Sequence, residues 1–430
     1  MKEFKVVSLS KNKNTIYMAY LGWFIVTLFY FYQYILRVAP GVLVTDLRFA
    51  FRLTADEFAT LGSYYLYAYA LFQIPLGFIV DCVGVRKTVL ASITLCIAGA
   101  YLFSTSQVFW TLQLSRIMVG LGSACAFMCA LKLVVDSFPM GKRGFLMGAT
   151  LTLGTVGALV AGKPLALLSE AVGFRQAIND VAILGLFILI ITFVLLPKPK
   201  KENLIPLTKA LPKHLWASLL DVFKSRPIML YAILAVAVYT PLSVLADLWG
   251  VAFLMQKYAL GRVDAAKISM MMYLGLGIGC LTLPWLSEKY HYLNRSIRLS
   301  ACAVLVLFGL LLYGPILSQS MLMVLLTLLG IFCGAEMLCF TGAGQYTHTY
   351  NVGITLGVVN TLNMLGGGLL QQLIGFGLDQ FWDGKVDEAG LRMYTTANYT
   401  LVLSILMIVI TICCLLSLRL PKDSVVKNKD

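Results

Sequence analysis

The stretch Gly77-Phe-Ile-Val-Asp81-Cys-Val-Gly84-Val-Arg86-Lys87 is a short charged turn between two long apolar runs. Gly84 supplies the backbone freedom that a tight reversal needs. Arg86 and Lys87 follow the end of an apolar segment, where membrane proteins keep positive charge on the cytoplasmic side. Asp81 lies at the same boundary, and an acid there needs a partner such as a nearby arginine or a helix N-terminus. Taken alone, the pattern also fits an ordinary charged turn, so the rest of the chain decides its meaning.

The composition predicts a protein that crosses a membrane many times. Of the 430 residues, 59% are hydrophobic and 13% are charged, and the mean hydropathy is +0.84. No soluble core could bury that much apolar surface. The first apolar segment is too long for a cleaved signal peptide and has no small-residue cleavage site, so we expect it to stay as the first span.

The net charge of +14 is compatible with nucleic-acid binding, because basic patches attract phosphate. The placement of the charges argues against that partner. Of the 34 lysines and arginines, 22 fall on predicted loops of one side, 8 on the other side, and 4 inside predicted spans, when residues at the very ends of spans are counted with the loops. This asymmetry follows the positive-inside rule, and it predicts that both termini are cytoplasmic.

Apolar runs of about 20 residues, the length needed to cross ~30 Å of hydrocarbon, recur along the whole chain. We place twelve of them near residues 17–42, 57–81, 87–105, 108–136, 144–168, 177–196, 228–256, 266–287, 298–316, 320–344, 352–378 and 394–418.

The long polar segment 197–226 divides these spans six and six. The predicted domains are therefore an amino-terminal bundle (1–196), a basic linker (197–226), a carboxy-terminal bundle (227–420) and a cytoplasmic tail (421–430). Within the linker, residues 211–223 alternate apolar and polar side chains at helical spacing, with Trp216 as a candidate interfacial anchor. This segment fits either a helix on the membrane surface or a flexible linker.

The spacing Gly-x-x-x-Asp-x-x-Gly-x-Arg-Lys at residues 77–87 resembles the loop signature between the second and third helices of the major facilitator superfamily. Arg116-Ile-Met-Val-Gly120-Leu-Gly122 resembles the second motif of that superfamily, an intramembrane arginine followed by close-packing glycines. Asp136-Ser-Phe-Pro139 resembles the turn after that span. The resemblance implies an all-α membrane fold of 12 transmembrane helices in two six-helix halves, and transport by alternating access.

Two stretches depart from the family pattern. In the second half, Pro284-Trp-Leu-Ser-Glu288-Lys289 keeps an acid and a base of the signature turn but loses both glycines. Within the fifth span, the stretch from Gly154 to Pro164 lacks the Gly-Pro pattern of the superfamily's exporters. This absence disfavours a drug-type antiporter.

A finer resemblance points to one bacterial branch of the family. Phe31-Tyr-Gln-Tyr-Ile-Leu-Arg37-Val-Ala-Pro40, Leu248-Trp-Gly-Val-Ala-Phe253 and Gly357-Val-Val-Asn360 are similar to organic-solute permeases. These include phagosomal amino-acid and nucleoside transporters and permeases of carboxylate siderophores.

Charged side chains inside the bilayer are the best guide to function, because each costs at least ~2.5–3.5 kcal/mol and needs a partner or a wet cavity. Arg37 lies late in the first span, and Tyr30, Gln33 and Tyr34 share its helix face. This stripe predicts a solute-binding role for the four residues. Alternatively, Arg37 extends its charged end to the outer interface.

Lys163 lies late in the fifth span, at a height similar to that of Arg37. Two cations at one level would repel unless an anion joins them, and a carboxylate or phosphate on the solute is the economical candidate. Alternatively, Lys163 pairs with Asp247 across the two halves and acts as a gate. Both could apply in different states.

Lys132 and Asp136 are one helical turn apart and can neutralise each other. By resemblance to the family, Asp136 would join Asp81 and Arg86 in an inner charge cluster that holds the inner side closed. Gly77, Gly84 and Lys132 complete the predicted gating motif. By the same resemblance, Arg116 would be a proton-coupling or a packing arginine.

The second half offers two candidate proton carriers, Asp247 and Glu336. A carboxyl group in a low-dielectric site holds its proton more tightly than in water, so it can bind and release one near neutral pH. Alternatively, Glu336 is a permanently protonated structural acid. Tyr239 shares a helix face with Asp247, and Asn360, Asn363, Gly367 and Gln371 form a stripe that suits a solute-binding wall or close helix packing.

The sequence thus predicts a proton-coupled importer of a small anionic or zwitterionic organic solute, such as an amino acid, a carboxylate or a carboxylate siderophore. An exporter and a transport-dead sensor of the same fold remain alternatives. We expect a monomer in the bacterial inner membrane. An enzyme is not expected, because His214, His291 and His348 show no triad or metal spacing, and neither do the ten cysteines. No cofactor or metal is expected either.

Overall fold

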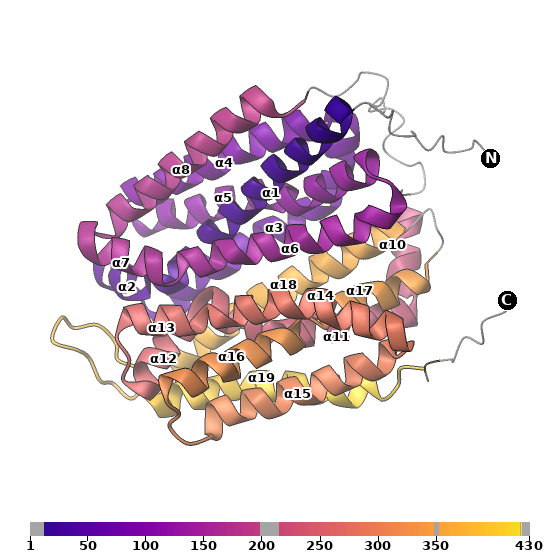
Figure 1. Ribbon diagram of the computed structural model, residues 1–430. Coiled ribbons are helices and arrows are strands. Elements are labelled where there is room, and N and C mark those ends of the chain that lie inside the picture. Colours follow the sequence, from indigo (N-terminus) through magenta and orange to yellow (C-terminus); the bar gives the residue numbers. More distant parts are fainter. Residues whose placement is uncertain (1–12, 198–214, 348–351, 422, 424–430) are drawn as a thin grey trace.

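The computed structural model describes residues 13–197, 215–347, 352–421 and 423, and its described residues are almost entirely helical (Figure 1). The first half contains α1 (Lys13–Val42), α2 (Val44–Phe51), α3 (Ala55–Val83), α4 (Val85–Thr105), α5 (Phe109–Ser137), α6 (Met140–Ala161), α7 (Lys163–Val172) and α8 (Phe174–Leu195). The helix α10 (Leu215–Lys224) precedes the second half. The second half contains α11 (Arg226–Pro241), η2 (Leu242–Trp249), α12 (Gly250–Tyr258), α13 (Arg262–Ser269), α14 (Met271–Tyr290), α15 (Leu293–Tyr313), α16 (Gln319–Cys333), α17 (Glu336–Gln345), α18 (Val352–Gln380) and α19 (Thr396–Ser417).

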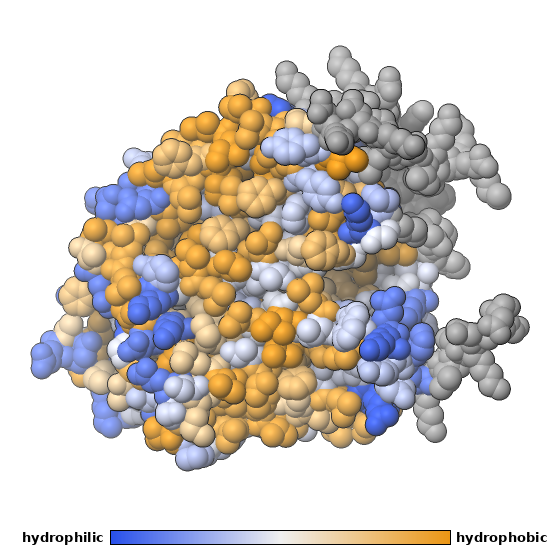
Figure 2. Space-filling model, in the orientation of Figure 1, coloured by the Kyte–Doolittle hydropathy of each residue, from blue (hydrophilic) through white to orange (hydrophobic). Residues whose placement is uncertain are grey.

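Among the described residues, 11 helical segments are long and apolar enough to cross a membrane, and they correspond to eleven of the twelve predicted spans. The remaining predicted span, 57–81, lies within α3, a helix of 29 residues that is not among these eleven. Figure 1 shows two bundles, α1–α8 above and α11–α19 below, with α3 and α18 packed together where the bundles meet. On the face shown in Figure 2, apolar residues predominate in the middle of the molecule and hydrophilic residues gather at its two ends. This distribution is the one expected of helices that end at two membrane surfaces.

We name the two ends of the bundle by their elements. The linker end carries α10, the start of α11 and the end of α19, and the far end carries α2, α7 and α13 (Figure 1). The segment 211–223 is helical from Leu215 onward, and its earlier residues lie outside the described part of the chain, as do His214, His348 and most of the tail. Its contact with a membrane surface therefore stays a prediction.

Prolines interrupt the helices beside the junction of the halves. Pro241 ends α11, and the next eight residues form the wider π-helical turn η2, all of them buried. A proline cannot donate a backbone hydrogen bond, and π-turns are frequent at functional sites. Pro40 lies inside α1, so the carbonyl of Leu36, four residues earlier, loses its helical partner. These interruptions leave backbone carbonyls without helical hydrogen-bond partners, and they reorient side chains where the two halves face each other.

Gly41 lets α1 of the first half touch η2 of the second half. A Cβ atom at this position would lie 2.7 Å from the carbonyl oxygen of Asp247 and 2.9 Å from Cα of Leu248. Both are backbone atoms, so they cannot rotate away. Gly120 packs in the same way, because its Cβ would overlap the carbonyl oxygen of Tyr65. The close-packing role predicted for Gly120 is thus seen in the structure.

Gly41→Ala is expected to lower the free energy of unfolding by roughly 1–3 kcal/mol, the usual cost of overpacking. Thermal unfolding of the purified protein measures the effect. Gly357→Ala is the matched control, because no atom lies within 4 Å of a Cβ placed there. Equal midpoints for the two variants would show that α1 and η2 do not need this close approach.

Candidate functional site at the junction of the halves

The centre of the site is an ion pair between Arg37 of α1 and Asp247 of η2. The Arg37 Nη2 and Nε atoms lie 2.7 Å and 3.0 Å from Asp247 Oδ2. The two residues are 5% and 3% exposed, so water does not screen the pair. Removing one partner of such a buried pair typically costs roughly 3–5 kcal/mol, because the other charge stays behind. Because the partners come from different halves, the pair joins the two bundles.

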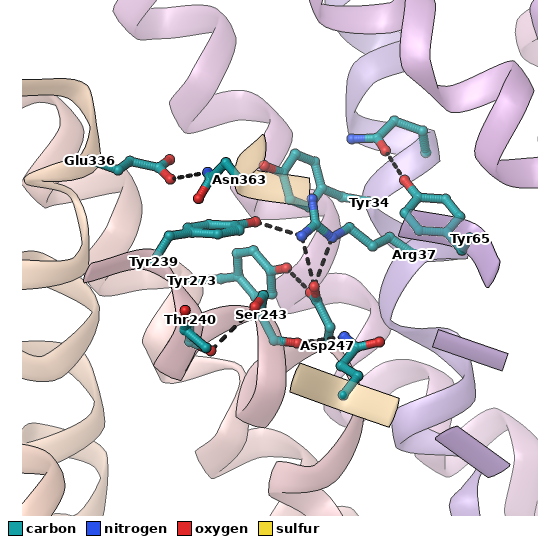
Figure 3. Close-up of polar contacts among 12 residues, drawn as sticks. Tyr34, Arg37, Tyr65, Tyr239, Thr240, Ser243, Asp247, Tyr273, Glu336 and Asn363 are labelled. Atoms are coloured by element: carbon teal, nitrogen blue, oxygen red, sulfur yellow. Dashed lines mark hydrogen bonds and ion pairs between the residues drawn. The ribbon is translucent and has the colours of Figure 1, made fainter. Parts of the chain in front are cut away.

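Tyrosines complete the surroundings of the ion pair. Arg37 donates a hydrogen bond to the Tyr239 hydroxyl, and Tyr273 of α14 donates one to Asp247 (Figure 3). The guanidinium carbon lies 5.7 Å from the centre of the Tyr34 ring and 5.8 Å from that of Tyr239. Both charges therefore have hydrogen-bonding or cation–π partners apart from each other. Arg37 and Asp247 can therefore separate without either charge being left buried and unpaired.

The predicted stripe before Arg37 is buried in protein rather than facing lipid. Tyr30, Gln33 and Tyr34 are 6%, 2% and 5% exposed. The hydroxyls of Tyr30 and Tyr34 are 3.3 Å apart, and Gln33 accepts a 2.8 Å hydrogen bond from Tyr65 of α3. The interfacial alternative for Arg37 does not fit, since its guanidinium turns toward the second half instead.

Arg116 binds backbone carbonyls rather than an acid. Its guanidinium donates to the carbonyl oxygens of Leu61 and Leu36, each at 2.7 Å, and to that of Arg37 at 3.2 Å. The Leu36 carbonyl is the group that Pro40 leaves without a helical partner. Arg116 therefore holds α1 in the shape that presents Arg37. Of the two predicted alternatives, this geometry supports the packing role.

Glu336 is the first residue of α17, directly after the helix break at Gly334 and Ala335. It is 7% exposed and accepts a 3.0 Å hydrogen bond from Nδ2 of Asn363 in α18. Among the described residues, the Oδ1 atom of Asn363 has no donor. An amide can donate to a carboxylate or accept from a carboxylic acid, so Asn363 suits either protonation state of Glu336.

The rest of the α18 stripe packs against η2. Gln371 donates a 2.6 Å hydrogen bond to the Ser243 carbonyl, and Gly367 lies against the Ser243 side chain. Asn360 is half-buried, one helical turn from Asn363. Of the two predicted roles of the stripe, close helix packing therefore fits Gly367 and Gln371.

Lys163 does not join the central cluster. It is exposed at the first position of α7, because Gly162 ends α6 and Pro164 cannot continue that helix. The predicted alternative in which Lys163 pairs with Asp247 is wrong for this structure, since Arg37 holds that carboxylate. The interrupted helix is the physical reason, because it turns the side chain away from the face that carries the cluster.

The signature turn forms a charge cluster at the linker end. Lys132 lies 2.9 Å from Asp81 and 3.7 Å from Asp136, so Asp81 finds its partner on α5.

Gly84 has a φ of 85°, which a glycine adopts without strain. The sequence predicts that Arg86 joins this cluster, but in the structure it does not. It donates to the carbonyls of Leu196 and Phe193 at the end of α8, where a helix exposes unpaired acceptors. Gly77 has open space around it.

Two contact groups join the halves at the far end, and sequence reasoning missed both. Arg262 at the start of α13 pairs with Asp46 of α2, and its Nη2 lies 3.5 Å from Glu170 of α7. The second group is centred on Asp379 at the end of α18. Its carboxylate accepts hydrogen bonds from the backbone N–H groups of Ala55 and Asp56, at 3.3 Å and 2.8 Å, and so caps α3 of the other half. We call these two groups the far-end lock.

Arg392 and Tyr394 support Asp379 from the loop that follows α18. Arg392 lies 2.9 Å from the carboxylate, and Tyr394 donates a hydrogen bond to it. Burial raises the pKa of the Tyr394 phenol, and its hydrogen bond to Asp379 raises it further, so it stays a donor at physiological pH. Among the described residues, the ion pairs that cross between the halves lie at the centre and at the far end.

Asp379→Asn combined with Arg262→Gln is expected to open the far end. Charge-assisted hydrogen bonds contribute roughly 1.5–3 kcal/mol each, so the ratio of molecules with an open far end to those with a closed one should rise at least tenfold. Labelling of a cysteine introduced at Ser63 of α3, which is buried against α18, measures the opening as a faster rate of modification. Lys385→Gln is the control, since Lys385 pairs only within its own loop. An unchanged labelling rate in the double variant would refute the lock.

The sequence matches the model of the Major Facilitator Superfamily over residues 18–370. The chain belongs to this family. Its relatives include an uncharacterized transporter, YybO, from Bacillus subtilis, 35% identical over 26% of each chain, and a probable sulfoacetate transporter, SauU, from Cupriavidus necator, 26% identical over 36% of each chain. The matches thus span about a quarter and about a third of these relatives' lengths. A probable sugar efflux transporter from Mannheimia succiniciproducens is 22% identical over 78% of this chain and 83% of the relative.

Solved structures have the same fold. A bacterial homologue of the human lysosomal transporter Spinster, crystallised in an inward-facing and unoccupied conformation, superposes with a TM-score of 0.74 at 16% identity over 93% of this chain and 96% of its own. A variant of the nucleoside transporter NupG gives 0.71 at 14% identity over 92% and 98%. The predicted fold and family are confirmed: the chain is a multi-pass, all-α member of the superfamily, and the relatives named above are described as transporters, not as enzymes. The finer likeness to siderophore and phagosomal permeases stays a prediction.

Proposed function

We propose that this family member imports a small organic solute that carries a carboxylate, together with a proton. The observation that carries the proposal is the buried pair of Arg37 and Asp247, which joins the two halves and has its own polar partners. A solute carboxylate can replace Asp247 on Arg37, because the planar guanidinium fork matches the two oxygens of a carboxylate in shape.

The displaced Asp247 would keep the hydrogen bond from Tyr273. A zwitterionic solute would add an ammonium group for Asp247, so an amino acid satisfies both partners at once. A plain carboxylate would leave Asp247 to take up a proton, since an unpaired buried charge is costly. The remaining polar lining of the proposed site comes from Tyr30, Gln33, Tyr34, Tyr239, Asn360 and Asn363.

Glu336 is the proposed proton carrier. It is buried at the start of a half-helix, and Asn363 accommodates both its charged and its neutral form. A proton acceptor next to the solute site allows binding of the two to be linked. Asp247 is the second candidate, because solute binding would change its partner.

The far-end lock supports transport by alternating access. With the lock closed, exchange would occur through the linker end, which we infer to be cytoplasmic from the excess of lysine and arginine there. Opening of the lock and closure around the Asp81, Lys132 and Asp136 cluster would expose the site to the other side. We place the protein in the bacterial inner membrane, as a monomer.

The second candidate is export. It is favoured by the Mannheimia succiniciproducens relative, a probable sugar efflux transporter, which covers the greatest share of the chain among the relatives described above. The proposed site contains the same residues in either case, and only the direction of the proton-driven cycle differs.

A ligand screen with pairs of compounds that differ in one anionic group tests the proposed solute class. Purified protein is heated with sugar acids and their parent sugars, amino acids and their amides, and sulfonates and their alcohols. We expect the compounds with an anionic group to raise the unfolding midpoint and their partners without one to leave it unchanged, because only an anionic group can form an ion pair with Arg37. Stabilisation by the neutral sugars alone would refute an anionic solute.

A further inference from the structure

A basic cavity lies at the linker end of the second half, away from the central site. Its volume is about 300 Å³, and it lies between the start of α11, the end of α17 and the residues that follow α19. Arg226 and Arg419 line it together with Tyr231 and Tyr346, and Leu230 and Leu420 add apolar walls. Nothing in the proposed transport cycle uses this cavity.

The two arginines bring like charges to one small space. Both are exposed, and neither guanidinium group has a hydrogen bond or an ion pair within the described part of the chain. Two guanidinium groups on one cavity repel unless an anion lies between them, and their planar forks match the oxygens of a phosphate. The N-terminus of α11, which has no side-chain cap at Ser225, adds positive potential at the same place.

The aromatic wall of the cavity is ordered. The rings of Tyr231 and Tyr346 lie 5.9 Å apart, and the Tyr231 hydroxyl donates a 2.7 Å hydrogen bond to Asn294 of α15. Tyr231 is therefore fixed, while Tyr346 is 44% exposed. Tyrosines are enriched where membrane helices meet the headgroup layer, since the ring is apolar and the hydroxyl polar.

The surface next to the cavity is apolar. Leu415 in the last turn of α19 and Leu418 directly after that helix are 61% and 67% exposed. Side chains of this kind face lipid tails in a membrane-spanning bundle. A ligand in the cavity can thus place its anionic group on the arginines and its tails along α19, which a free phosphate ion cannot do.

We propose that this cavity binds the phosphate of an anionic phospholipid headgroup at the cytoplasmic leaflet. Basic pockets between membrane helices on this side are suited to such headgroups. Binding there joins α11, α17 and α19, and so stabilises the linker end of the second half.

Thermal unfolding of the full-length protein in detergent tests the site. Phosphatidylglycerol, phosphatidylcholine with the same acyl chains, and inorganic phosphate are each titrated. We expect phosphatidylglycerol to raise the unfolding midpoint, and the other two to leave it unchanged. A double variant, Arg226→Gln with Arg419→Gln, should bind the anionic lipid at least about tenfold more weakly. The variant with both residues changed to lysine keeps the charge and should retain part of the response.

Lys385→Gln, at an exposed far-end loop, is the matched control and should respond as the unmodified protein does. An equal response of the double glutamine variant would overturn the site, and so would stabilisation by phosphatidylcholine to the same degree. A response to inorganic phosphate alone would assign the cavity to a soluble phosphate and overturn the lipid. Native mass spectrometry of lipid retained by the same variants provides a second readout that does not depend on stability.

Discussion

Arg37→Gln is expected to abolish solute uptake and to destabilise the protein. The change removes two charge-assisted hydrogen bonds to Asp247 and leaves that carboxylate without its ion partner in a site where it is 3% exposed. The proposed solute loses the same two bonds, each of roughly 1.5–3 kcal/mol, so uptake should fall about a hundredfold or more. Initial uptake rates in proteoliposomes and the thermal unfolding midpoint measure the two effects.

Two further variants separate binding from stability. Arg37→Gln combined with Asp247→Asn removes both charges, so the unfolding midpoint should recover while uptake stays lost. Lys163→Gln is the matched control, because it removes a cation from the same half at an exposed position. Normal uptake by the Arg37 variant, or an equal loss in the Lys163 variant, would contradict the role of Arg37.

Glu336→Gln is expected to abolish accumulation driven by a pH gradient and to leave exchange intact. The amide has nearly the shape of the carboxylic acid and can still hydrogen-bond to Asn363, but it cannot release a proton. The variant should behave as the protonated protein at every pH, so the rise in uptake as the outer pH falls should flatten. Uptake at a series of outer pH values and counterflow exchange of labelled solute are the two measurements.

Glu388→Gln is the control for this experiment, because Glu388 is exposed in the loop before α19. It should keep both the pH dependence and the accumulation of the unmodified protein. Undiminished pH-driven accumulation in the Glu336 variant would move the proton to another acid, with Asp247 as the next candidate.

The fold could be predicted because its signals are local. Apolar runs long enough to span a membrane, the Gly77 to Lys87 turn and the glycines after Arg116 each act over a few residues. The interruptions inside the spans were not predicted, since an average over 20 apolar residues is insensitive to a single proline or glycine. That is why the sequence predicts Lys163 inside a continuous fifth span, whereas the structure ends α6 at Ala161 and begins α7 at Lys163, directly before Pro164.

The candidate site could be predicted in part. Arg37, Asp247 and Glu336 stood out because a charge within an apolar run is costly and needs a reason. Tyr273 carried no such signal, since a tyrosine among apolar residues is ordinary. The partners of the far-end lock lie outside the predicted spans, where charges are expected, and Asp46 meets Arg262 across 216 positions of sequence. Pairing between the two halves is set by their packing, which no local pattern reports.

A structure determined with the transported solute bound tests the central claim most directly. The account predicts that an anionic group of the solute lies within hydrogen-bonding distance of the Arg37 guanidinium, with Asp247 moved away or holding a cationic group of the solute. A solute bound elsewhere, with the pair of Arg37 and Asp247 intact, would contradict it.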